Sequence, residues 1–168
     1  SSDIKKRFSK ILNIIIEKKS FYNAVLLILA SNVFDFRFDL DQLVYILDDE
    51  ILLNSTFVNN TSLKEMIDFS RDEIKVRSSI LSEAILTNLD DQQILIDCLI
   101  KVVKKVSTRM HDSKMKQTHR AIISFSRLQR ILNKKSPTYK QTLISFFEEV
   151  KNLISTRNDP YFWLQYAI

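Results

Sequence analysis

The order of apolar and polar positions predicts a chain of helices that is interrupted once by a β-hairpin. Within residues 66–77 four apolar residues alternate with polar ones: Ile67, Phe69, Ile74 and Val76. A period of two is typical of half-buried strands. The polar residues 70–73 predict the turn between the two short strands, and Ser78 or Ser79 can then cap a helix that continues to about residue 86.

Upstream of the hairpin, apolar residues recur at helical spacing in four segments. The expected helices cover residues 3–18, 21–33, 40–47 and about 61–67. Residues 24–30 are apolar all round, which predicts that the second helix lies in the core. Asp39 and Gln42 have the spacing of a capping box before the third helix, and Ser62 and Glu65 repeat it before the fourth. Residues 51–58 are compatible with loop, strand or a helical turn.

The order of helices, two-stranded hairpin and closing helix is that of a winged-helix unit, a variant of the helix-turn-helix. The alternative is an all-helical bundle in which residues 67–77 form an irregular connection. The winged-helix interpretation assigns residues 1–87 to a winged-helix-like domain and residues 88–168 to a helical domain.

Beyond residue 87 the pattern predicts further helices that form an antiparallel bundle or the entry to a helical repeat. Asp90 and Gln93 have capping-box spacing before the first, and a second covers about residues 116–133. The cap-and-proline pairs 136–137 and 159–160 predict two more starts. The side chains expected to face inward from the last two helices are Leu143, Phe147, Val150, Ile154, Phe162 and Trp163.

Composition excludes several classes of protein. The 168 residues contain no Gly, which rules out a P-loop or a Gly-rich dinucleotide fingerprint, and a hydrophobic content of 45% rules out general disorder. No signal peptide or membrane span is visible, and Cys98, the one cysteine, lies in an apolar helical pattern as a buried thiol. These features predict a cytoplasmic chain. A start at Ser1 and an end within an apolar pattern predict a segment of a larger protein.

Positive charge is concentrated in residues 101–140, which contain Asp112 as their one acidic residue. We call their Lys and Arg residues the basic belt: Lys101, Lys104, Lys105, Arg109, Lys114, Lys116, Arg120, Arg127, Arg130, Lys134, Lys135 and Lys140. Such a belt can attract nucleic acid or an acidic protein surface. It can equally be a solvated face, or one paired with the acidic residues of segment 35–50 or with another domain. No aromatic residues alternate with the cations as base-stacking platforms.

Catalytic and metal-binding patterns are not found in the sequence. His111 and His119 lack the neighbouring ligands of a metal site, and both imidazoles are expected to be exposed or half-buried. No nucleophile, general base or oxyanion arrangement is visible. The expected helix 61–67 carries one Lys and one Glu, which is a poor recognition helix for DNA. The sequence therefore predicts no enzyme and no cofactor in this segment.

Segments 21–33 and 40–47, the stretch IKVRSSILSEAIL and the ending NDPYFWLQYAI together resemble the region downstream of the nucleotide-binding domain in bacterial STAND-type P-loop ATPases. In that family a winged-helix-like unit and helices lead into a helical-repeat sensor. The Walker motifs and the regulatory winged-helix His of some relatives have no counterpart here. The resemblance implies ATP for the parent protein only, and it points to Arg77 as a possible contact with a nucleotide domain.

The expected function is that of a non-catalytic regulatory or coupling segment of a larger STAND-type NTPase, which transmits sensor or nucleotide state in antiviral defence. Its partners would be other domains of the parent protein or further copies of it, with no membrane involved. The alternative is a winged-helix module that binds nucleic acid through the basic belt at 101–140.

Overall fold

The computed structural model describes residues 3, 6, 9, 19–53, 55–70 and 72–168, so the expected helix 3–18 lies almost wholly outside the described residues. The first half contains α2 (Lys19–Val33), α3 (Leu40–Leu47), η1 (Glu50–Leu53), α4 (Ser55–Val58), α5 (Thr61–Met66), β1 (Ile67–Phe69), β2 (Ile74–Val76) and α6 (Ser79–Thr87). The second contains α7 (Gln92–Val106), η2 (Ser107–Arg109), α8 (Ser113–Ile122), α9 (Phe125–Ile131), α10 (Tyr139–Val150) and α11 (Pro160–Ala167). The expected mainly α fold with one hairpin is therefore confirmed.

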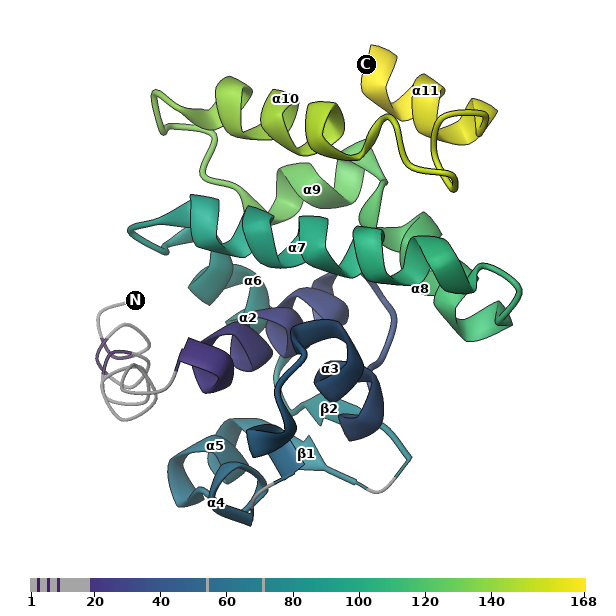
Figure 1. Cartoon of the computed structure of the whole chain (residues 1–168). Helices are drawn as coiled ribbons and strands as arrows, with labels where there is room; N and C mark the ends of the chain where they lie inside the picture. Colours follow the sequence, from purple (N-terminus) through teal and green to yellow (C-terminus); the bar gives the residue numbers. More distant parts are fainter. Residues whose placement is uncertain (1–2, 4–5, 7–8, 10–18, 54, 71) are drawn as a thin grey trace.

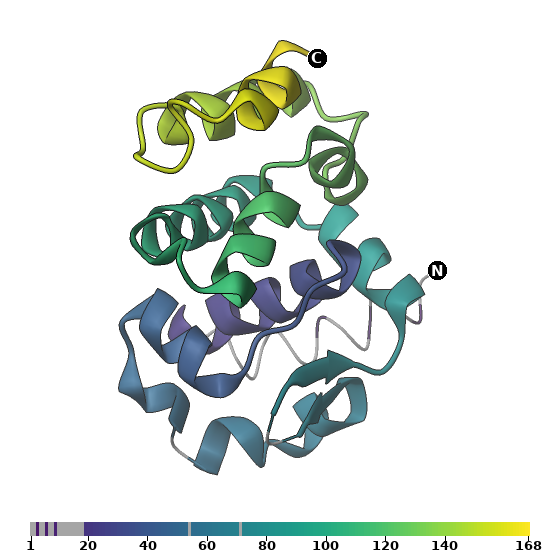
Figure 2. The same cartoon turned by 90° about the vertical axis from the view of Figure 1, so that its right-hand side faces the viewer.

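The helices are stacked in layers (Figures 1 and 2). Helices α10 and α11 lie at one end, α7, α8 and α9 follow, then α2, α3 and α6, and the hairpin with α4 and α5 lies at the other end. Helix α7 is central, because it packs against α2 and α3, against α8 and against α10. One hydrophobic core runs through both halves. The division into domains 1–87 and 88–168 stays a prediction.

Helix α2 is the centre of the N-terminal half, as its apolar sequence predicts. Every side chain from Ala24 to Ala30 is fully buried. Helix α3 begins with the predicted capping box, in which the Asp39 side chain accepts from the Gln42 backbone N–H and the Gln42 side chain accepts from that of Asp39. None of the helices that the structure describes has the length and apolarity needed to cross a membrane.

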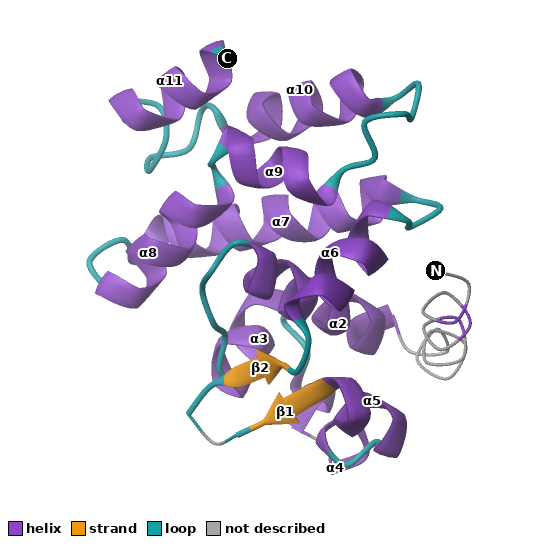
Figure 3. Ribbon diagram, turned by 180° about the vertical axis from the view of Figure 1, so that it is seen from behind, coloured by secondary structure: helices purple, strands orange, loops and turns teal. Residues whose placement is uncertain are grey.

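The hairpin forms where period-two alternation predicts it, and the all-helical alternative is wrong. Ile67 pairs with Val76 and Phe69 with Ile74 in the antiparallel hairpin (Figure 3). These four side chains share the strand face that is buried or half-buried. The pair between them, Asp68 and Lys75, is exposed and oppositely charged. The strands can form because the inward face completes the core beneath α2 and the outward face stays solvated.

The expected single helix over 116–133 is two helices. Ser124 adopts extended backbone angles and separates α8 from α9. The break exposes the backbone N–H of Phe125, which donates to the Gln165 side-chain oxygen of α11 at 2.9 Å. Gln165, which is distant in sequence, therefore satisfies the backbone donor at the start of α9. The periodicity within residues 116–133 could not reveal this partner or the break that it supports.

Three predicted helix starts are displaced. Asn60, not Ser62, caps α5, and Asp91, not Asp90, caps α7. Helix α10 begins at Tyr139, because Ser136 accepts the Thr138 N–H in a turn that precedes it. In each region several residues can cap, and the tertiary path of the incoming chain selects one of them.

Two side chains expected in the core are at the surface. Helix α10 ends at Val150, so Ile154 leaves the apolar stripe and is 73% exposed. Phe162 is fully buried as expected, whereas Trp163 is 41% exposed and donates its indole N–H to the Arg157 carbonyl at 2.8 Å. The two neighbouring side chains therefore differ: Phe162 packs into the core, and Trp163 covers the preceding loop.

Candidate functional site

Four of the twelve residues of the basic belt form ion pairs with carboxylates of other elements. The ion pairs are Lys104–Glu149 at 3.3 Å, Lys105–Asp48 at 2.6 Å, Lys114–Asp39 at 3.4 Å and Arg130–Glu83 at 2.9 Å. Two of these partners, Asp39 and Asp48, belong to the acidic segment 35–50. The interpretation in which the belt pairs with that segment is confirmed for these two cations, and the belt is not a uniform cationic face.

Tyr45 of α3 contacts the last turn of α7 and the end of η2. The Arg109 guanidinium lies 3.8 Å from the centre of the Tyr45 ring, and the Lys105 ammonium lies 5.1 Å from it. The Tyr45 hydroxyl donates to the Lys105 carbonyl at 3.3 Å. Cations over an aromatic face are attracted by its negative quadrupole, so one ring positions two belt residues.

Arg77 has a local partner. Its Nε donates to the Lys64 carbonyl in the last turn of α5 at 3.0 Å, and its backbone N–H donates to the Met66 carbonyl at 2.9 Å. Arg77 therefore joins the end of the hairpin to the end of α5 while remaining exposed. Its contact with a nucleotide domain stays a prediction.

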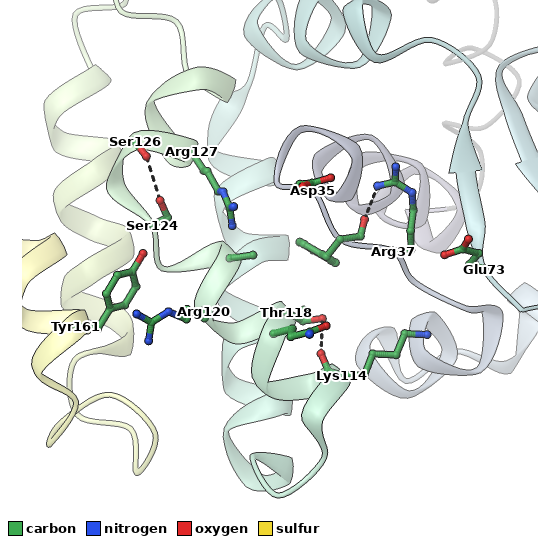
Figure 4. Close-up of a pocket in the computed structure, with 13 residues that line it drawn as sticks. Asp35, Arg37, Glu73, Lys114, Thr118, Arg120, Ser124, Ser126, Arg127 and Tyr161 are labelled. Atoms are coloured by element: carbon green, nitrogen blue, oxygen red, sulfur yellow. Dashed lines mark hydrogen bonds between the residues drawn. The ribbon is translucent and has the colours of Figure 1, made fainter.

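Three belt residues line a cleft of about 640 Å³ between loop 34–38, the hairpin, α8, the start of α9 and α11. Lys114, Arg120 and Arg127 share it with Arg37, and we call it the basic cleft (Figure 4). The remaining lining residues are Asp35, Phe36, Glu73, Gln117, Thr118, Ala121, Ser124, Ser126 and Tyr161. The other candidates, Lys101, Lys104, Lys105, Arg109, Lys116 and Arg130, do not line this cleft.

Backbone hydrogen bonds build the wall of the basic cleft that carries Arg37. Asp35 has a left-handed backbone (φ 60), which reverses the chain after α2. The Phe36 N–H then donates a hydrogen bond to the Ser31 carbonyl of α2 at 3.0 Å, and the Ile74 N–H of β2 donates to the Phe38 carbonyl at 2.8 Å. The loop is thus tied to α2 and to the hairpin, and Arg37 is presented on a fixed backbone.

Positive charge dominates the basic cleft. Lys75 donates a hydrogen bond to the Glu73 carboxylate at 2.9 Å and thereby lowers the Glu73 pKa, and the nearby charges of Arg37 and Lys114 lower it further. The Arg120 guanidinium lies 3.9 Å from the centre of the Tyr161 ring, and the close-up shows the two side by side. The arrangement can hold an anion, because cations from separate elements line one hollow.

Sequence reasoning missed Asp35, Arg37 and Glu73. A signal existed in the run FDFRF over residues 34–38, where polar side chains alternate with aromatic ones that anchor the loop. It gave no information about α8 and α11, which complete the basic cleft only in the fold.

The remaining candidates for chemistry are buried or isolated. Cys98 is buried as expected, and burial raises the pKa of its thiol to about 12. His119 is also buried, which corrects the expectation of an exposed or half-buried imidazole. Its Nε2 lies 2.8 Å from the Ser155 hydroxyl oxygen. Burial lowers the His119 pKa to about 4. Within the described ranges, no group of three His, Cys, Asp or Glu residues could hold a metal ion.

Comparisons of the chain with protein-family models, with curated proteins and with solved structures found no match. The functional argument therefore depends on the residues and contacts of this chain.

Proposed function

We propose that this chain is a non-catalytic coupling module, in which the C-terminal helices are held against the winged-helix-like unit so that a change in one is transmitted to the other. The observation that carries the proposal is the way belt cations reach back to the first half of the chain. Lys105 binds Asp48, Lys114 binds Asp39 and Arg130 binds Glu83.

The main effect of these ion pairs is to fix the orientation of the helices relative to one another. Exposed pairs of this kind stabilise a fold by at most about 1 kcal/mol each. Arg130 also donates to the Val33 carbonyl at 3.4 Å, and Tyr45 clamps Arg109 and Lys105. Polar contacts with defined partners at several points fix the position of α7 and α9 relative to α2 and α3, and a coupling module needs such a fixed relation.

The setting of the module is proposed from the sequence resemblance alone. It is that of a larger STAND-type NTPase in antiviral defence, whose sensor or nucleotide state the module transmits. ATP would be bound by the parent protein and not by this segment. Arg77 would contact a neighbouring domain through the part of its guanidinium that does not bind the Lys64 carbonyl.

A nucleic-acid-binding module is less well supported. Helix α5, the expected recognition helix, is six residues long and presents Lys64 beside Glu65. On the hairpin, Asp68 pairs across the strands with Lys75. These neighbouring opposite charges cancel where a DNA-binding surface needs excess positive charge.

Duplex DNA binding tests the proposal. Titration of a fluorescently labelled duplex with the chain should show only weak association at low salt, because several belt cations already have carboxylate partners. The comparison variant carries Lys116, Lys134 and Lys140 changed to Gln, three exposed cations that form no ion pair within the described part of the chain. Tight binding that falls steeply with salt and is lost in this variant would overturn the proposal.

A further inference from the structure

The basic cleft gathers unneutralised positive charge. Its lining contains four cations, Arg37, Lys114, Arg120 and Arg127, and two carboxylates, Asp35 and Glu73. The Glu73 carboxylate is already engaged by Lys75. The cations come from loop 34–38, α8 and α9, so the folded chain brings together charges that are far apart in sequence.

The donors of these cations are only partly used. Among the residues that the structure describes, neither Arg37 nor Arg127 forms an ion pair, and both are half-buried. Arg37 uses one terminal nitrogen to donate to the Phe36 carbonyl at 2.8 Å. Arg120 lies over the Tyr161 ring, a position that occupies its face and leaves its in-plane N–H groups available. Lys114 has one long ion pair, to Asp39 at 3.4 Å.

We propose that the basic cleft binds a small molecule that carries phosphate groups. Three guanidinium groups offer planar, forked pairs of N–H donors, which match the oxygens of phosphate. The volume of about 640 Å³ is typical of a small-ligand site and exceeds the size of a single phosphate, so the rest of the ligand also fits. The inference does not depend on the coupling function, although a ligand here would touch both loop 34–38 and α8.

Titration calorimetry with inorganic pyrophosphate tests the inference. The chain should bind one pyrophosphate saturably, and Arg37→Gln and Arg127→Gln should each weaken binding by about tenfold, since each removes charge-assisted hydrogen bonds. Lys140→Gln is the matched control: it removes one positive charge from an exposed residue that does not line the basic cleft, and should leave the affinity unchanged. Thermal melting of each variant verifies that it is folded.

Three outcomes would overturn the inference. The first is no saturable binding of pyrophosphate by the wild-type chain. The second is an equal loss of affinity in Lys140→Gln, which would mean that only the overall charge attracts the anion. The third is binding of citrate as tightly as pyrophosphate, which would make the basic cleft a general polyanion site without preference for phosphate.

Discussion

His119 makes the stability of the fold depend on pH. Its imidazole is 1% exposed and lies against the Ser155 hydroxyl, and desolvation outweighs the opposing charge of Asp159 and lowers its pKa to about 4. In the unfolded chain the group titrates at its ordinary value of 6.5. The unfolded state therefore binds the extra proton first as the pH falls, and this side chain makes folding less favourable in acid.

We expect His119 to cost about 2 kcal/mol of folding stability between about pH 7 and about pH 5. The loss begins near the unfolded pKa and continues until the folded pKa is reached. His119→Gln retains a polar side chain that does not titrate, so its free energy of unfolding should fall less over the same interval. Urea denaturation at several pH values measures the difference, and parallel pH profiles for the two proteins would contradict this account.

At the scale of the element, α5 shows how much a short helix depends on its cap. The helix has six residues, too few for intrahelical hydrogen bonds to satisfy most of its backbone donors. The Asn60 side chain accepts from the Leu63 N–H at 3.1 Å, and at the other end Arg77 donates to the Lys64 carbonyl. Side chains outside the helix therefore define both of its ends.

Asn60→Ala should lower the free energy of unfolding by about 1 kcal/mol, because it leaves the first-turn N–H of α5 without its partner. Ser62→Ala is the matched control and should change stability by only a few tenths of a kcal/mol, since that position is inside the helix. Urea denaturation of both variants decides between the two caps. A larger loss for Ser62→Ala would restore the capping box that the sequence predicts.

At the scale of the whole molecule, α7 connects the two halves. Its apolar face includes Leu99, which is fully buried in the single core, and α7 packs against α2 as well as α10. Because the two halves share this helix, we expect them to unfold together, as the proposed coupling function requires.

Leu99→Ala should therefore lower the midpoint of one common transition, at a cost of about 2–5 kcal/mol. Leu164→Ala is the control, because this side chain is 62% exposed and should change the midpoint little. Far-UV circular dichroism follows all helices and Trp163 fluorescence follows the C-terminal ones. Separate transitions by the two probes, with only one of them moved by Leu99→Ala, would contradict a shared core.

Most of the elements were predictable, because local patterns carry them. Seven apolar residues in succession predict the buried α2, strict alternation predicts the hairpin, and Asp39 with Gln42 predicts the start of α3. The break at Ser124 and the true caps were not predictable, since they depend on partners such as Gln165 that lie far along the chain.

The sequence by itself determined the mainly helical class, the hairpin and the concentration of positive charge at 101–140. Only the tertiary structure decided what that charge contacts. Coulomb attraction depends on distances between residues that are remote in sequence. The pairing of Lys105 with Asp48 and the position of Arg37 and Arg127 along one cleft therefore exist only in the folded chain. Burial of His119 was decided in the same way, because residues remote in sequence, such as Ser155, lie against its ring.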